Sequence, residues 1–294
     1  MENPIVNLEK LSEPLTKLVE VISKGVGTLY APFGTIRQAK ADAEATIIVA
    51  RADAEAAEIQ ERAKARIEYR ECLRQENIEK ISSQAALELP ETVSEKPVDT
   101  DWTLQYFDYA QDVCDEDMQK LWSRILAGEV ASPGSYSKRT LQFLRTLDKD
   151  EAEAFTKICS LSVTLDREWY HLISNKETDK VLRDMFSRSI PIKHFISIGL
   201  LLSDAYLINP SDATGMRVNY FSKEFLLEGP EKNNSGTIAS LEIPISVRGF
   251  TSIGQELASI AGGLAVEGYI ERVAESVEQE YNVKFRNSDG SSDS

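Results

Sequence analysis

The sequence predicts a mainly α-helical protein that ends in a small α+β module. Three observations predict this fold class. An alanine-rich run without glycine or proline extends from Ile36 to Leu87, apolar residues recur at helical spacing from Asp101 to Glu151, and strand-like alternation is confined to the last third of the chain. With 294 residues and 42% apolar content, the chain has room for two modest domains or for one domain with an extended element.

The predicted elements follow one another in a simple order. We expect an amphipathic N-terminal helix within residues 1–35, a long alanine-rich stalk or oligomerisation helix at 36–89 and a linker at 90–98. A compact helical domain at 99–170, an α+β module at 171–286 and a disordered Ser/Asp-rich tail at 287–294 complete the chain. The linker is placed at 90–98 because Pro90 and Pro97 bracket a polar stretch.

The N-terminal segment has one apolar helical face. The residues of this face are Leu15, Leu18, Val19, Ile22, Val26, Leu29 and Phe33, at gaps of three and four. Gly25 and Gly27 weaken the middle of the helix and would allow another helix to approach closely. We favour packing of this face on the chain itself or on an oligomer partner. A membrane-surface helix is the alternative, although acidic residues on the polar face suit anionic lipid poorly.

The alanine-rich run carries an eleven-residue repeat. Its stripe comprises Ala41, Ala45, Ile48, Ala52, Ala56, Ile59, Ala63 and Ile67, continues through Arg70 and Arg74, and becomes apolar again at Ile78, Ile81 and Ala85. This period is near 3.67 residues per turn and favours straight or slightly right-handed helix pairs. A helix of this length is rarely stable without a partner, so the stripe predicts a homo-oligomer. A single solvent-exposed helix is the alternative.

Short helices are expected between residues 100 and 165. Asp112–Asp115 looks like a turn, Gly128 ends a helix, and Asp148 with Glu151 has the form of a capping box. The loop that follows Gly128 is flanked by a motif of charged and turn residues, namely Arg124, Glu129, Pro133, Gly134 and Arg139. We favour a structural Arg124–Glu129 pair that orders the turn over an anion or partner site held by the arginines.

The last third of the chain predicts a helix at 191–207, strands at 216–221 and 241–247 joined by a turn-rich loop, and helices from Thr251 and near 266–281. This order is compatible with a winged-helix module as one form of the α+β unit. A basic group precedes the first of these helices and would contact phosphates in such a module; it comprises Lys180, Arg183, Arg188 and Lys193. We favour a protein–protein module instead.

Composition excludes several classes of function. The chain has 48 Asp and Glu against 33 Lys and Arg, a net charge of −15, which argues against a general nucleic-acid binder. Much of this acidity lies in residues 86–118, with ten Asp or Glu and one Lys. The sequence contains no phosphate-binding glycine loop, and its two histidines are 23 residues apart, so no cofactor and no metal are expected.

The three cysteines, Cys72, Cys114 and Cys159, are far apart and suit a reducing cytosol. Cys159 stands among apolar residues, so a buried structural thiol is favoured over a nucleophile paired with His171. We see neither a signal peptide nor a spanning helix, and we therefore expect a cytoplasmic protein that can reach the inner membrane only as a peripheral protein.

The block from Asp115 to Leu141 resembles a group of bacterial proteins that share M-Q-x-L-W-x-R-I-L-A-G-E followed by P-G-x-x-S-x-R-T-L. Here the first part ends at Glu129, and the second begins at Pro133. The front half, with Leu11–Leu18 and Arg74–Glu79, is similar to the same group and to the Abi-alpha type of abortive-infection protein. The resemblance covers most of residues 8–165 and implies a bacterial cytoplasmic protein in phage defence. It implies no particular chemistry.

These observations favour a non-enzymatic, self-associating protein. The long helix would assemble copies, and the C-terminal module would recognise a protein partner or phage component. A regulatory nucleic-acid-binding protein is the first alternative, and a metal-dependent nuclease is the second. The nuclease ranks last because no carboxylate cluster is paired with a catalytic lysine.

Overall fold

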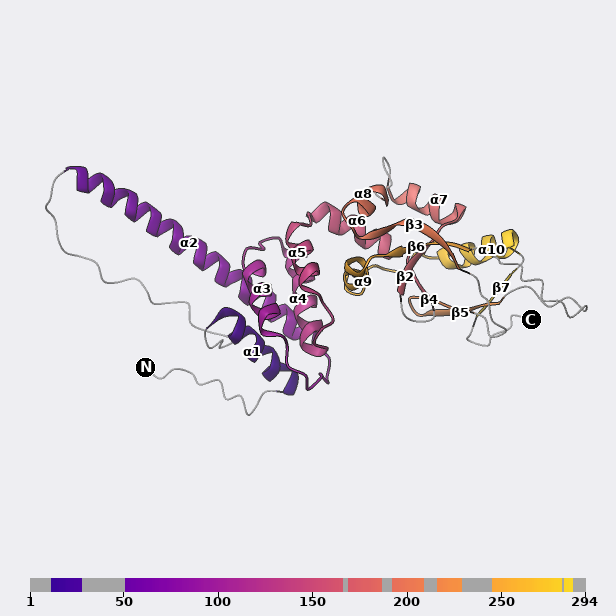
Figure 1. Cartoon of the computed structure of the whole chain (residues 1–294), viewed down its shortest axis with the longest axis horizontal. Coiled ribbons are helices and arrows are strands. Elements are labelled where there is room, and N and C mark those ends of the chain that lie inside the picture. The colour runs from indigo at the N-terminus through magenta and orange to yellow at the C-terminus, as the bar shows by residue number, and fades with distance from the viewer. Residues whose placement is uncertain are drawn as a thin grey trace, which may run out of the picture. The chain divides into compact units, whose positions relative to one another are not determined.

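The computed structural model describes residues 12–27, 51–165, 169–186, 192–208, 216–228, 245–281 and 283–287. These residues belong to two compact units, Met1–Thr146 and Leu147–Ser294. The first unit is helical and the second combines helices with one antiparallel sheet (Figure 1). The predicted class, mainly helical with a C-terminal α+β module, is therefore confirmed.

The first unit consists of α1 (Glu13–Val26), α2 (Arg51–Glu88), α3 (Thr100–Ala110), α4 (Glu116–Ala131) and α5 (Lys138–Thr146). Its core is aromatic: the side chain of Tyr106 stacks on Trp102 and meets Trp122 edge to face, with ring centroids 5.2 and 5.3 Å apart. Asp99 caps α3 by accepting the backbone N–H of Trp102, and Asp115 caps α4 in the same way. The turn expected between these two helices is confirmed.

Helix α1 packs its apolar face against α3 and α4 of the same unit. Leu18 and Ile22 are buried, and a Cβ added to Gly25 would lie 1.9 Å from Cδ2 of Phe107. The close approach expected at Gly25 is thus present. The helix ends at Val26, followed by Gly27 with a positive φ of 75°, so it is shorter than the sequence suggested. Leu29 and Phe33 lie outside the described residues.

The structure divides the chain later than the proline-rich segment at 90–98. That segment lies within the first unit, where the Ser94 N–H donates to the carbonyl of Ala131 and Lys17 donates to the carbonyl of Ser94. The division into units falls between Thr146 and Leu147, inside the expected helical domain at 99–170. Prolines and polar residues mark a connection with little secondary structure, but hydrogen bonds from both sides can still hold it on the core.

The second unit opens with α6 (Lys149–Cys159), where the Asp148–Glu151 capping box is present. Its other helices are α7 (Lys176–Met185), α8 (Ile192–Ser197), α9 (Ser252–Ala258) and α10 (Tyr269–Tyr281). The strands are β1 (Val163–Leu165), β2 (Trp169–Ile173), β3 (Leu201–Ile208), β4 (Met216–Tyr220), β5 (Lys223–Glu228), β6 (Ile245–Phe250) and β7 (Lys284–Asn287).

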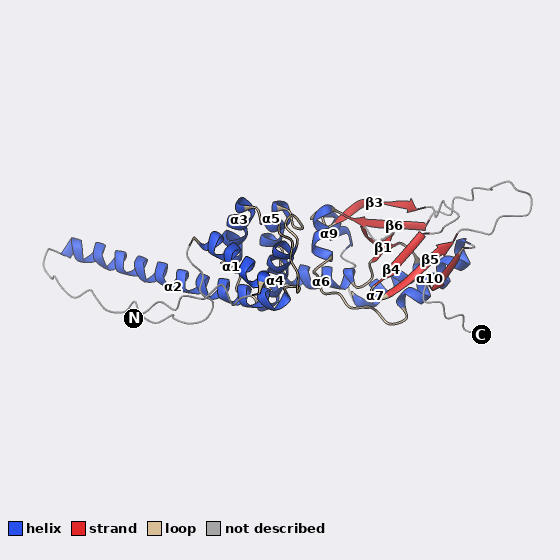
Figure 2. Cartoon of the chain, turned by 90° about the horizontal axis from the view of Figure 1, so that it is seen from below, coloured by secondary structure: helices blue, strands red, loops and turns tan. Residues whose placement is uncertain are grey.

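The seven strands form one sheet in the order β3-β6-β2-β1-β4-β5-β7, and every neighbouring pair is antiparallel (Figure 2). Phe155 of α6 meets both Phe195 of α8 and Phe250 of β6 edge to face, which joins helices to the sheet. Tyr269 of α10 hydrogen-bonds Thr178 of α7 and the carbonyl of Leu161. The sheet is larger than the two strands that the sequence predicted, and so larger than in the winged-helix form that was one option for this unit.

Two predictions in this unit are wrong. The helix expected at 191–207 ends at Ser197, because Gly199 takes a φ of 87° and the apolar residues beyond it form strand β3. The strand expected at 216–221 is present as β4. The strand expected at 241–247 overlaps β6 at 245–247, and residues 241–244 lie outside the described residues. These two strands do not form a hairpin with each other. Instead β4 turns tightly into β5, and β6 lies between β3 and β2.

Candidate functional site

The most informative surface of the chain is one face of α2. The stripe residues Ile59, Ala63, Ile67, Arg70, Arg74, Ile78, Ile81 and Ala85 fall at gaps of three and four along this helix. The helix has 38 residues, far above the usual 11–12. Its stripe has two different environments, and the change between them occurs at the two arginines.

The C-terminal part of the stripe is buried inside the first unit. Ile78, Ile81 and Ala85 are all buried where α2 packs along α4. Asn77, also buried, accepts a 3.0 Å hydrogen bond from Gln119 of α4 and donates to the carbonyl of Gln111 at 2.9 Å. These contacts fix the rotation of α2 on the helical core, because a rotated helix would leave the amide groups without partners.

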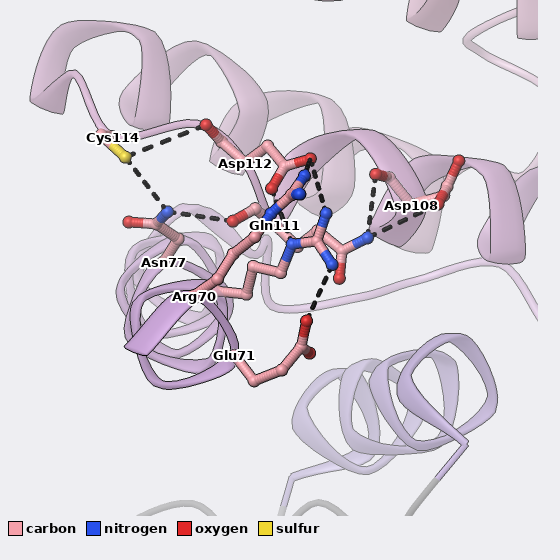
Figure 3. A network of polar contacts seen from close by, with 8 residues as sticks. Arg70, Glu71, Asn77, Asp108, Gln111, Asp112 and Cys114 are labelled. Carbon is pink, nitrogen blue, oxygen red and sulfur yellow. Dashed lines mark hydrogen bonds and ion pairs between the residues drawn. The ribbon is translucent and has the colours of Figure 1, made fainter. Parts of the chain in front are cut away.

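An ion-pair cluster, which we call the polar collar, marks the end of this packed region. It consists of Arg70 and Arg74 of α2 and of Asp112 from the α3–α4 turn (Figure 3). Arg74 donates to both carboxylate oxygens of Asp112, from Nε at 2.7 Å and from Nη2 at 3.1 Å, and it also donates to Glu71 at 2.9 Å. Arg70 Nη2 lies 3.8 Å from Asp112. A bidentate pair of this kind fixes direction as well as distance.

The collar also changes the ionisation of its members. The hydrogen bond from Arg74 is the largest influence on the Asp112 carboxyl group and lowers its pKa. The same hydrogen bond raises the pKa of Arg74. The carboxylate therefore stabilises the fold above the ordinary Asp range, and this contribution is lost as pH falls through the lowered pKa. At neutral pH the Arg74–Asp112 pair therefore stays charged.

Beyond the collar, the N-terminal part of the stripe faces solvent. None of the residues from 58 to 72 is buried, and the side chains of Ile59 and Ile67 are 56% and 58% exposed. Ala63 between them is partly exposed. Ala52 and Ala56 lie on the described backbone of α2, whereas Ala41, Ala45 and Ile48 lie outside the described residues. The face that packs on α4 thus continues for several turns without a described helix against it (Figure 1).

The motif loop is ordered by hydrogen bonds to Glu129. The buried carboxylate of Glu129 accepts the backbone N–H groups of Gly134 at 2.7 Å and Tyr136 at 3.0 Å. Arg124 lies 3.8 Å from Glu88, and Arg139 is exposed. Backbone donors therefore hold Glu129 at this turn, and the Arg124–Glu129 pair stays a prediction.

The apolar face proposed for membrane or partner contact is already occupied. Leu18 and Ile22 are buried against the first unit, and Leu15, Val19 and Val26 are partly exposed. Among the described helices, none combines the length and the apolar character needed to cross a membrane. Contact of α1 with lipid would require it to leave this packing.

The basic group of the second unit does not form a continuous positive face. Lys180 and Arg183 are exposed on α7 and Lys193 is exposed on α8, while Arg188 lies outside the described residues. On α7 the three basic residues alternate with three acidic ones, so the helix carries no net charge. A helix with this charge distribution gives phosphate groups little electrostatic attraction.

Cys159 and His171 do not meet. The Cys159 thiol is buried, and burial raises its pKa, which suits a structural thiol. It lines a cavity of about 300 Å³ together with uncharged residues that include Thr164, Tyr170 and Asn219. His171 instead hydrogen-bonds the carbonyl of Trp169 and the hydroxyl of Tyr206. Within the described ranges, no group of His, Cys, Asp and Glu side chains could hold a metal ion.

His171 predicts a pH dependence for the second unit. Burial is the main cause that lowers the pKa of this imidazole, so the unfolded chain binds the proton more readily than the folded one. We expect the second unit to lose stability as the pH falls through about 6.5, the ordinary histidine value. Hydrogen exchange at β2 and β6, measured across this range, should show faster opening at low pH. His171→Gln should flatten the profile, and an unchanged profile would contradict the assignment.

Sequence reasoning missed the role of Asp112 in the polar collar, because it assigned this residue only to a turn. It also did not foresee the hydrogen bonds from the backbone of Gly134 and Tyr136 to Glu129. A signal for Asp112 was nevertheless present, because Arg70 and Arg74 interrupt an otherwise apolar stripe. The turn at 112–115 offers two carboxylates, and arginine binds carboxylates in a bidentate way.

These features define a class of protein: a helical unit with a partly unpaired, alanine-striped helix, followed by a unit built on a seven-stranded antiparallel sheet. Residues 61–274 match the family described as "Protein of unknown function (DUF2806)", and the chain belongs to this family. Searches of the curated proteins and of the solved structures found no significant match.

Proposed function

We propose that this protein is a non-enzymatic assembly protein whose copies associate through the exposed part of α2. The observation that carries the proposal is the continuation of the stripe past the polar collar. The same helix face that buries Ile78 and Ile81 presents Ile59 and Ile67 to solvent. A helix of this length usually gains its stability from packing of an apolar face, so a second helix is the expected partner.

The free energies of burial and of association support a modest but specific association. Burying the exposed part of each isoleucine contributes on the order of 1 kcal/mol, and the alanines contribute less. Association costs at least several kcal/mol in lost freedom, so two side chains would not suffice. The stripe gains further free energy by repetition, because each stripe residue is buried once on each of the two identical helices. Small alanines also let the helix backbones approach closely.

The decisive experiment changes the stripe without touching the packed core. Ile59→Glu combined with Ile67→Glu should shift the protein from an oligomer to a monomer in multi-angle light scattering, with at least a tenfold weaker association. The charges would be desolvated in any helix pair that uses this face. Because both residues are exposed, the circular dichroism spectrum of the isolated chain should change little.

The matched control is Ala65→Glu. Ala65 is exposed and lies two residues after the stripe residue Ala63, on the opposite side of the helix. This variant should keep the oligomer. A wild-type protein that is monomeric at micromolar concentration contradicts the proposal, as does an oligomer that is unaffected by the double substitution.

The second unit is the proposed partner-binding part. Its edge strand β3 carries the exposed apolar residues Leu202, Tyr206 and Leu207, and an exposed edge can pair with an added strand. Together with the resemblance to abortive-infection proteins, this supports a role in phage defence in which assembly brings several such units together. Phage plaque counts on cells that express the wild type, the double variant or Ala65→Glu test this role. Protection should be lost in the double variant alone.

A further inference from the structure

Charge is distributed unevenly along the N-terminal part of α2. Residues 51–61 contain one Arg, one Asp and three Glu, a net charge of −3. Residues 62–74 contain five Lys or Arg and two Glu, a net charge of +3. The two segments have nearly equal length and opposite charge, and they meet beside Ala63. Two parallel copies in register would place like segments side by side, whereas two antiparallel copies would place opposite charges together.

The stripe has a matching symmetry. Counted in both directions from Ala63, its positions follow at four, three and four residues: Ile59, Ala56 and Ala52 on one side, and Ile67, Arg70 and Arg74 on the other. An antiparallel pair centred on Ala63 therefore sets Ile59 of each copy against Ile67 of the other. The alanines at 52 and 56 then lie opposite the arginines of the collar, whose guanidinium groups already point to Asp112.

We infer that the partner of this surface is a second copy of the chain, bound antiparallel with Ala63 at the centre of the contact. This inference rests on the proposed function and adds its direction and register. The contact would span residues 52–74, a length of about 33 Å. The polar collar ends it on each side, because the stripe beyond Arg74 is occupied by α4 of the same chain.

Cysteine cross-linking tests direction and register. The full chain with Cys72→Ser and Cys114→Ser removes the exposed thiols, and buried Cys159 stays. In this background Ala63→Cys should form a disulfide-linked dimer by itself. Ile59→Cys and Ile67→Cys should each fail to do so, because identical residues would be offset by about 12 Å along the axis. A mixture of these last two variants should form the linked heterodimer.

Each other result overturns the inference. Self-linking of both Ile59→Cys and Ile67→Cys shows a parallel pair. A dimer by light scattering in which the mixture does not cross-link shows another register or another surface. A monomer by light scattering overturns the proposed function as well. Cross-linking thus tests the direction of the pair, and light scattering on the same samples tests whether the chain assembles at all.

Salt dependence gives a second test that needs no substitution. Opposite charges attract in the antiparallel pair, so raising NaCl from about 0.05 M to about 0.5 M should weaken dimerisation several-fold as the charges are screened. Like charges repel in a parallel pair, and the same salt series would strengthen it. Sedimentation equilibrium of the wild type measures the sign, and a dimer that becomes tighter with salt contradicts the antiparallel arrangement.

Discussion

Glu129→Ala should destabilise the first unit by about 3 kcal/mol. The substitution removes the acceptor of two backbone N–H groups, those of Gly134 and Tyr136. Tyr136 is buried, so water cannot replace the lost acceptor at its N–H without opening the loop. A hydrogen bond to a charged group contributes roughly 1.5–3 kcal/mol, and a donor left buried costs about 1–3 kcal/mol.

The environment of the Glu129 carboxylate makes this loss of stability larger than the loss of two hydrogen bonds alone would be. Glu129 lies in the last turn of α4, where the helix dipole disfavours an anion. The carboxylate is retained there with the loop donors and with the positive charge of Lys17 nearby, an interaction that raises the pKa of Lys17 against the stronger lowering by burial. Glu129→Gln should recover only part of the stability, because an amide group offers one acceptor and turns donors toward the other N–H.

Tryptophan fluorescence during urea unfolding measures this effect. Trp102 and Trp122 are buried in the first unit, and Trp169→Phe removes the third tryptophan from the signal. Glu116→Ala, an exposed glutamate of the same helix, is the control and should change the free energy of unfolding by about 0.5 kcal/mol at most. If Glu129→Ala behaves like this control, the carboxylate does not order the loop.

The predicted and the observed fold agree where the signal is local. The capping box at Asp148, the N-cap at Thr251 and the close approach at Gly25 each depend on a few adjacent residues, and each is present. Such patterns can be read from the sequence because their physical cause is local. A capping side-chain oxygen, for example, either reaches a backbone N–H of the next turn or does not.

The predictions fail where distant segments decide. The apolar residues of 201–207 continue the helical pattern of α8, but sheet pairing with β6 makes them a strand. Strands β1 and β2 are only three and five residues long and gain their order from neighbours that are far away in the sequence. Short apolar segments fit either structure, and tertiary contacts select between them.

The candidate surface on α2 likewise combines a feature that is local in the sequence with one that depends on distant residues. The repeat of the stripe was readable from residues 41–67 alone, because periodicity is a local property. The place where the stripe leaves the protein core was not readable, since it depends on the distance between Arg74 and a turn that lies 38 residues away. That contact lies between the isoleucines of α2 that are buried and those that are exposed.

Gly254→Ala should destabilise the second unit by about 3 kcal/mol, although helix propensity alone predicts the opposite sign. Gly254 lies in α9, where alanine is favoured over glycine by about 1 kcal/mol in an isolated helix. In the folded unit, however, an added Cβ would lie 2.1 Å from the carbonyl oxygen of Leu200 and 3.2 Å from Cβ of Phe250. Such contacts require the backbone to move.

The backbone around Leu200 has little freedom to move. Its carbonyl accepts the N–H of Thr251, and the Thr251 hydroxyl donates to the carbonyl of Gly199 at 2.6 Å and accepts the N–H of Gly254 at 3.1 Å. Relief of the clash would therefore break the cap of α9 or the link between α9 and the start of β3. Overpacking against mobile side chains typically costs 1–3 kcal/mol, and a rigid backbone should place this site at the upper end.

Hydrogen exchange of the amides in β3, β6 and α9 measures the change within the full chain, because it reports the opening free energy of each element separately. Ser252→Ala, at an exposed position of the same helix, is the control and should leave exchange nearly unchanged. Slower exchange in Gly254→Ala would mean that propensity outweighs the contact with Leu200. Faster exchange confined to the second unit would show that the contact between α9 and Leu200 leaves no room for a methyl group at position 254.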